Sequence, residues 1–210
     1  ELEEGWSIKA HKLKKVTVSP NNPHFKYLDD EHQIIIGKSD KSTKNFDVII
    51  YSHHSIEKVT IPPYIKRIAS YAFLCCKQLT QIEIPDDSNL ESIGKKAFHS
   101  SSLKSIKIPS SVKKLEEGWQ LSSQFISVEI SPNNKNFKYL DDKHQIIIGK
   151  SDINSENFDV IICSDRSIEK VVIPPYIKRI ASYAFFCCKQ LTQIEIPDDS
   201  NLESIGKKAF

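Results

Sequence analysis

The chain has 210 residues, and its 29 basic and 27 acidic side chains leave a formal charge of +2. This balance argues against a nucleic-acid partner, which needs a clustered basic surface, and no apolar run approaches the roughly eighteen residues of a membrane helix. The 30 Ile outnumber the 12 Leu and 7 Ala. Because β-branched residues favour strands, this composition argues against a helical bundle.

A long internal repeat runs through the sequence. Residues 61–98 recur at 173–210 with a single difference, Leu74 in the first copy and Phe186 in the second, and residues 19–40 closely match 131–152. The offset is 112 residues, whereas the motif LEEGW at 2–6 returns at 115–119 with an offset of 113. Periodic self-similarity of this kind indicates stacked coils, which bury their apolar sides against their neighbours.

Shorter units divide this super-repeat, and each opens with Ile-Pro or a variant. In chain order we expect one solenoid with units near 2–17, 18–60, 61–83, 84–107, 108–129, 130–172, 173–195 and 196–210, of which 18–60 and 130–172 are long and the last is truncated. The apolar positions of the three short units are Ile65, Ile68, Ala72, Phe73, Leu79, Ile82 and Ile84; Leu90, Ile93, Ala97, Phe98, Leu103, Ile106 and Ile108; and Val112, Leu115, Gly118, Trp119, Phe125, Val128 and Ile130.

Local patterns predict the elements of each unit. Residues 81–84 alternate, so Ile82 and Ile84 should point inward as in a half-buried strand that ends at Pro85. We expect a single helical turn at residues 70–73. The inserted segment 137–150 is predicted to be a hairpin with Asp141-Asp142 in its turn. Stacking these coils would create a parallel sheet along one side.

The repeated string IPPYIKRIASYAFLCCKQLTQIEIP, together with the long unit SPNNKNFKYLDDKHQIIIGK, resembles the BspA-type leucine-rich repeat, most closely its protozoan, trichomonad versions. The resemblance implies a mainly β, right-handed solenoid with the parallel sheet on its concave face, helical turns on the convex side and inserted hairpins in the long units. It also implies a surface antigen that contacts host cells or matrix, at the cell surface or secreted. The pair Gly118-Trp119 departs from the usual Ala-Phe of the family.

The chain ends are expected to be cut from a longer array. There is no methionine, no leader pattern opens the chain, and Phe210 stops before the strand that its unit needs. Because terminal coils normally carry a polar cap, we expect frayed ends, with Phe210 mobile or in contact with another molecule, or end-to-end self-association.

Residues with reactive side chains give little indication of chemistry. Cys75-Cys76 and Cys187-Cys188 lack zinc-site spacing, and Cys76 falls at a position that needs a small buried residue, so we expect free thiols lining the core. His53-His54 is interpreted as a solvated loop rather than a metal site. Asp29-Asp30 and Asp141-Asp142, beside His32 and His144, lack the spacing of a calcium loop and are interpreted as turn formers.

No nucleophile elbow, phosphate loop or zinc-protease motif occurs, so we expect no enzyme, cofactor, metal or membrane insertion. What remains is the array of outward strand residues. They form the predicted binding site: Lys58, Thr60, Gln81, Glu83, Ser105, Lys107, Ser127, Glu129, Lys170, Gln193 and Glu195. Their mixed charges favour a protein or glycan partner, although the same residues would also keep an exposed sheet soluble. The sequence therefore predicts an interaction module, with a structural stalk or an intracellular scaffold as the alternatives.

Overall fold

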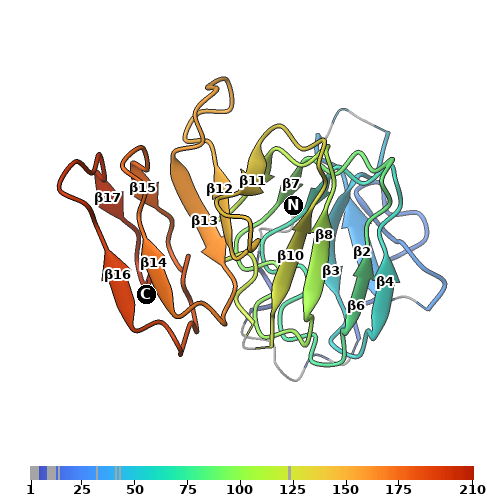
Figure 1. Ribbon diagram of the computed structural model, residues 1–210. Helices are drawn as coiled ribbons and strands as arrows, with labels where there is room; N and C mark the ends of the chain where they lie inside the picture. Colours follow the sequence, from blue (N-terminus) through green and yellow to red (C-terminus); the bar gives the residue numbers. More distant parts are fainter. Residues whose placement is uncertain are drawn as a thin grey trace.

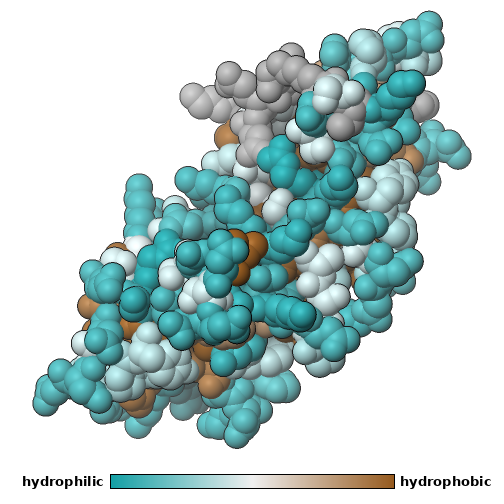
Figure 2. Space-filling view, turned by 90° about the horizontal axis from the view of Figure 1, so that it is seen from above, coloured by the Kyte–Doolittle hydropathy of each residue, from teal (hydrophilic) through white to brown (hydrophobic). Residues whose placement is uncertain are grey.

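The computed structural model describes residues 5–8, 13, 15–31, 33–40, 42, 44–122 and 124–210. Within these ranges the regular structure consists of strands and turns, and no residue is helical. The coils stack along one axis into an elongated β-solenoid (Figure 1). A view along a perpendicular direction shows the same elongation, with hydrophilic residues over most of that face (Figure 2). The prediction of a mainly β solenoid is confirmed.

Six strands follow one another along one side of the solenoid, and we call their outward-facing side chains the ladder face. The strands are β4 (Lys58–Thr60), β6 (Gln81–Glu83), β8 (Ser105–Ile108), β10 (Ser127–Ile130), β14 (Lys170–Val172) and β16 (Gln193–Glu195). Parallel pairing joins β4 to β6, β8 to β10 and β14 to β16, and β6 lies beside β8. Ile82 and Ile84 are buried whereas Gln81 and Glu83 are exposed, which confirms the predicted alternation.

The opposite side carries a second set of parallel strands, each two residues long. They are β5 (Arg67–Ile68), β7 (Ser92–Ile93), β9 (Lys114–Leu115), β15 (Arg179–Ile180) and β17 (Ser204–Ile205). The strands β5, β7, β9 and β15 each contribute one buried residue to the core, for example Ile68 and Ile93 at 0% exposure. Both sides of a coil are therefore strands, with turns between them.

Each long unit adds an antiparallel meander to this second sheet. The first meander comprises β1 (Phe25–Tyr27), β2 (Ile34–Gly37) and β3 (Val48–Ser52), and the second comprises β11 (Phe137–Tyr139), β12 (Ile146–Gly149) and β13 (Val160–Ser164). The sheet orders are β1-β2-β3-β5-β7-β9 and β11-β12-β13-β15-β17. The hairpin predicted for residues 137–150 is confirmed by the pairing of β11 with β12.

The second meander separates two clusters of the hydrophobic core. Phe137 and Ile147 pack with the preceding coils, whereas Ile146 and Ile148 pack with the following coils. Successive residues of a strand point to opposite faces, so one strand serves both clusters. The second meander thus lies between the two clusters and contributes side chains to both.

Aromatic side chains stack from coil to coil within the first cluster. Phe73 and Phe98 are both 0% exposed, and their ring centroids are 5.2 Å apart at an interplanar angle of 15°. Trp119 then meets Phe98 edge-on at 6.4 Å. All the predicted apolar positions of the short units that carry a side chain are buried, except Val128, which is half-buried. The predicted small-aromatic positions therefore form the continuous interior of the stack.

The expected helical turn at residues 70–73 is wrong. Tyr71 and Cys75 have positive φ angles of 63° and 58°, which a right-handed helix does not allow. The backbone N–H groups of Tyr71, Phe73 and Cys75 instead donate to carbonyls of Lys95, Ala97 and His99 in the next coil. Alternate N–H groups point along the stacking axis, so the segment is a series of turns.

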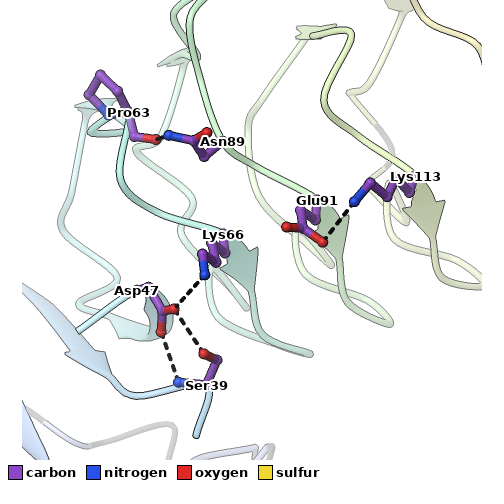
Figure 3. Close-up of polar contacts among 7 residues, drawn as sticks. All are labelled: Ser39, Asp47, Pro63, Lys66, Asn89, Glu91 and Lys113. Carbon is purple, nitrogen blue, oxygen red and sulfur yellow. Dashed lines mark hydrogen bonds and ion pairs between the residues drawn. The ribbon is translucent and has the colours of Figure 1, made fainter. Parts of the chain in front are cut away.

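Polar side chains and one close approach join neighbouring coils. Buried Asp47 accepts hydrogen bonds from the N–H and hydroxyl of Ser39 and lies 3.8 Å from the ammonium of Lys66 (Figure 3). Asn89 donates to the carbonyl of Pro63 at 3.0 Å in the same view. At Gly94 an added Cβ would lie 2.4 Å from the backbone nitrogen of Ser70, so this position has no room for a side chain.

The last coil exposes apolar residues. Phe210 is 50% exposed and stacks on Phe185 at 5.0 Å, and Ile194, Ile196 and Ile205 are also exposed. At the other end, residues 2–4 of the LEEGW motif lie outside the described residues. Fraying of the ends and contact of Phe210 with another molecule stay predictions.

Candidate binding surface

The residues predicted as a binding site lie on the ladder face. Of the eleven, ten are exposed and Lys107 is intermediate. Strand pairing sets them side by side, with Lys58 opposite Gln81 and Thr60 opposite Glu83. Further pairs are Ser105 with Ser127, Lys107 with Glu129, Lys170 with Gln193 and Val172 with Glu195. The structure thus brings the predicted residues into two groups, on β4 to β10 and on β14 with β16.

The ladder face carries charges of both signs. Lys107 donates a hydrogen bond to Asp86, with 2.7 Å between the ammonium nitrogen and a carboxylate oxygen. This bond, and to a lesser extent the charges of Asp86 and Glu129, raises the pKa of Lys107 above its ordinary value. Thr60 donates to Glu83 at 3.3 Å. Basic and acidic residues alternate from strand to strand, so the face does not present a single-sign field to a polyanion.

A tyrosine hydroxyl occupies the edge of β10 that no described strand pairs with. The hydroxyl of Tyr139 accepts a hydrogen bond from the N–H of Ile130 at 3.0 Å and donates to the carbonyl of Val128 at 2.9 Å. These are the groups that would otherwise pair with a following strand. Tyr27 makes the same two contacts with the N–H of Val18 and the carbonyl of Val16. The sequence analysis did not find this role, although both tyrosines sit in the repeated motif FKYL.

A groove lies beside β14, where the ladder resumes after the inserted meander. Its volume is about 490 Å³. The walls come from the turn between β11 and β12 and from the segment around β14: Leu140, Asp141, Asp142, Lys143, Gln145, Ile146, Ile168, Lys170, Val171, Val172, Pro174 and Tyr176. Val172 and Tyr176 are 55% and 53% exposed despite their apolar character. The groove therefore combines apolar surface with an edge of a strand.

Two of the five cysteines are held protonated by burial. All five are free thiols, and Cys76, 0% exposed, is buried as predicted. Burial raises the pKa values of both Cys76 and Cys163 to about 12. Since the thiolate is the nucleophile, these two groups stay protonated and unreactive at neutral pH.

The histidine and aspartate motifs have structural roles where they are described. The ring centroids of His53 and His54 are 4.2 Å apart at an interplanar angle of 30°, and Nδ1 of His53 lies 2.6 Å from the hydroxyl of Ser55. Asp29 accepts the N–H of Gln33 at 2.8 Å, as a turn former does, while His32 lies outside the described residues. Among the residues that the structure describes, no three His, Cys, Asp or Glu side chains are grouped to hold a metal ion.

Stacked coils with one strand per side, an inward small-aromatic pair and inserted hairpins define a repeat protein of the leucine-rich class. The family model "BspA type Leucine rich repeat region" matches residues 44–143 and 151–210 in six copies. The chain belongs to this family, as the sequence motifs predicted.

Solved structures share the fold. The pneumococcal vaccine antigen PcpA is 25% identical with a TM-score of 0.62, over 73% of this chain and 36% of its own. A leucine-rich cell surface protein from Faecalibacterium prausnitzii is 24% identical with a TM-score of 0.61, over 74% and 38% respectively. A leucine-rich repeat protein from Eubacterium ventriosum is 22% identical with a TM-score of 0.58, over 77% and 45%. The chain thus spans less than half of each of these proteins, and no protein with a curated description matches it.

None of the described segments forms a helix that is both long and apolar enough to span a bilayer.

Proposed function

We propose that this chain is a protein-interaction module of a cell-surface adhesin, and that the ladder face contacts a protein or glycan on host cells or in the extracellular matrix. The observation that carries the proposal is the exposed polar array on β4, β6, β8 and β10, where adjacent strands present residues of alternating charge over a rigid core. Extended solenoid faces of this kind are used for binding in repeat proteins.

The similar proteins support the proposed location. One is named a vaccine antigen and another a cell surface protein. Repeat proteins of the leucine-rich class generally mediate protein interactions, which favours a binding role over catalysis. A host-facing role remains part of the proposal and is the element that most needs testing.

The experiment has two arms. Antibody against the chain should stain unpermeabilised cells that carry the parent protein. In the second arm, the purified chain is applied to fixed mucosal epithelial cells and to reconstituted basement-membrane matrix. The double variant Glu83→Lys and Glu129→Lys reverses charge on the ladder face. The control with the same change in net charge is the double variant Glu156→Lys, between β12 and β13, and Glu203→Lys, next to β17 on the opposite side.

Binding that is lost in the ladder-face variant and retained in the control supports the proposal. Equal binding by both variants would show that the contact lies outside the ladder face. Surface staining without binding to either probe would instead favour a stalk, and staining only after permeabilisation would favour an intracellular scaffold.

A further inference from the structure

The edge of β14 that faces the groove has unpaired backbone groups. Alternate residues of a parallel strand present their N–H and C=O groups to opposite neighbours. The carbonyl of Glu169 accepts a hydrogen bond from the N–H of Thr192, and the N–H of Ile173 donates to the carbonyl of Glu195. The backbone groups of residues 169, 171 and 173, in and beside β14, are therefore directed toward β16. Lys170 and Val172 therefore direct their N–H and C=O groups to the other side, where they form no hydrogen bond with another described residue.

The two edges at this break in the ladder differ. The edge of β10 is closed by the hydroxyl of Tyr139. The edge of β14 opens instead into the groove of about 490 Å³. A strand edge that is neither paired nor covered is a template for another extended chain. A polypeptide in an extended conformation offers donors and acceptors at the spacing of Lys170 and Val172.

The groove walls indicate the side chains that such a chain would carry. Leu140, Ile146 and Ile168 are apolar residues of the groove lining, and Ile146 and Ile168 are buried, so the residues of the incoming strand that face them, every second one, should be apolar. Lys170 also lines the groove; it is exposed and forms no ion pair with another described residue. Asp141, Asp142 and Lys143 line the groove as well, so an acidic residue of the incoming strand is expected only beside Lys170, where it would complement this charge.

We propose that the open edge of β14 binds an extended peptide by strand addition, in which apolar side chains alternate with polar ones and an acidic residue lies beside Lys170. Main-chain hydrogen bonds to Lys170 and Val172 supply affinity, and the apolar groove selects the inward side chains, as in other strand-addition complexes. This site uses backbone atoms, the groove and the ammonium of Lys170. It shares Lys170 with the predicted ladder-face residues, but it uses none of those on β6 and β10.

The probe is a fluorescein-labelled hexapeptide, Thr-Val-Glu-Val-Thr-Val, acetylated and amidated, with binding followed by fluorescence anisotropy. Two N-methylated versions carry the methyl groups either on the valines or on the polar residues. Because one edge of an added strand faces β14 and the other faces solvent, one version should lose binding and the other should retain it. A peptide of the same composition in the order Val-Val-Val-Thr-Glu-Thr should bind more weakly.

The protein variants test the edge directly. Val172→Pro removes an N–H that does not bond to β16, and proline is tolerated where the N–H faces away from the ladder. We expect binding about tenfold weaker, the effect of one or two lost hydrogen bonds. Val172→Ala keeps the N–H and should weaken binding less. The Glu83→Lys and Glu129→Lys double variant should bind the hexapeptide as the wild type does, which separates this site from the ladder-face proposal.

A measurement on the wild-type chain keeps the test independent of variant folding. Peptide binding should slow hydrogen exchange at the amides of Lys170 and Val172. Unchanged exchange there, equal binding by Val172→Pro, or retention of binding by both N-methylated peptides would each overturn the proposal. If Val172→Pro binds the peptide as the wild type does, the peptide lies elsewhere, for instance along β16.

Discussion

Replacing Phe98 by Ala should cost far more stability than the same change at Phe210. The two residues end identical sequences, 89–98 and 201–210, but Phe98 is 0% exposed between Phe73 and Trp119, whereas Phe210 is 50% exposed. A buried aromatic side chain removes about 150–250 Å² from water, equivalent to roughly 4–6 kcal/mol at 25 cal/mol per Å² as an upper bound. Measured losses for buried Phe→Ala are about 3–5 kcal/mol.

We therefore expect a loss of about 4 kcal/mol for Phe98→Ala and about half of that for Phe210→Ala. The free energy of unfolding is measured by urea titration, followed by circular dichroism and by tryptophan fluorescence. Trp119 contacts Phe98, so fluorescence should report the local change first if the repeats unfold separately. An unchanged midpoint for Phe98→Ala, or equal losses in the two variants, would refute the proposed packing of the coils.

Three further changes test other contacts. Gly94→Ala should lower the free energy of unfolding by about 1–3 kcal/mol, since its Cβ would meet the backbone of Ser70 at 2.4 Å; unchanged urea unfolding would show that the coils can separate. Tyr139→Phe should cost about 1–2 kcal/mol by leaving the backbone groups at β10 unpaired, and it should speed hydrogen exchange at the amide of Ile130. The pKa values of Cys76 and Cys163 are raised by burial from 9.0 to about 12. Their contribution to stability is fully present below about pH 9 and is lost as the pH rises toward 12, because the unfolded thiols ionise first. Thermal melts between these pH values should show the decline, and a double Cys→Ala variant should show less of it.

Much of the ladder-face side of each coil could be predicted from local sequence. Residues 81–84 alternate between apolar and polar, and a strand with one buried face needs only this period. Ile82 and Ile84 are buried accordingly. The exposure of the predicted binding residues follows from the same rule, since their neighbours in the strand occupy the core.

The turn segment that follows β5 could not be predicted in the same way. The sequence around Ala72 and Phe73 has no glycine or proline to mark a turn, and its spacing is compatible with a helical turn. What decides its conformation is the adjacent coil, whose carbonyls accept the N–H groups of Tyr71, Phe73 and Cys75. These are contacts between residues more than twenty positions apart, and the positive φ values of Tyr71 and Cys75 follow from them.

The groove and the role of Tyr139 also depend on distant contacts. Tyr139, at the end of β11, bonds to residues 9 and 11 positions earlier on β10, and the groove forms between the meander turn and β14. The position of the insertion could be predicted from the sequence. That Tyr139 occupies the edge of β10 while the edge of β14 stays open could not be predicted. Repetition of FKYL was the available signal, because a tyrosine kept at equivalent positions in two copies is consistent with a shared contact.

The break in the ladder recurs with the super-repeat, which has a consequence for binding. Near the start of the first copy, Tyr27 closes the edge formed by residues 16–18, as Tyr139 closes the edge of β10. Among the described residues, β4, the strand that resumes the ladder there, pairs with β6 and with no other strand. The carbonyl of Glu57 and the N–H of Ile61 face β6, so the backbone groups of the two residues exposed on β4 point away from it, as those of Lys170 and Val172 do on β14. A partner that carries two extended segments could therefore engage strand edges in both copies. Its affinity would then depend on the length of chain joining the two segments as much as on either contact alone.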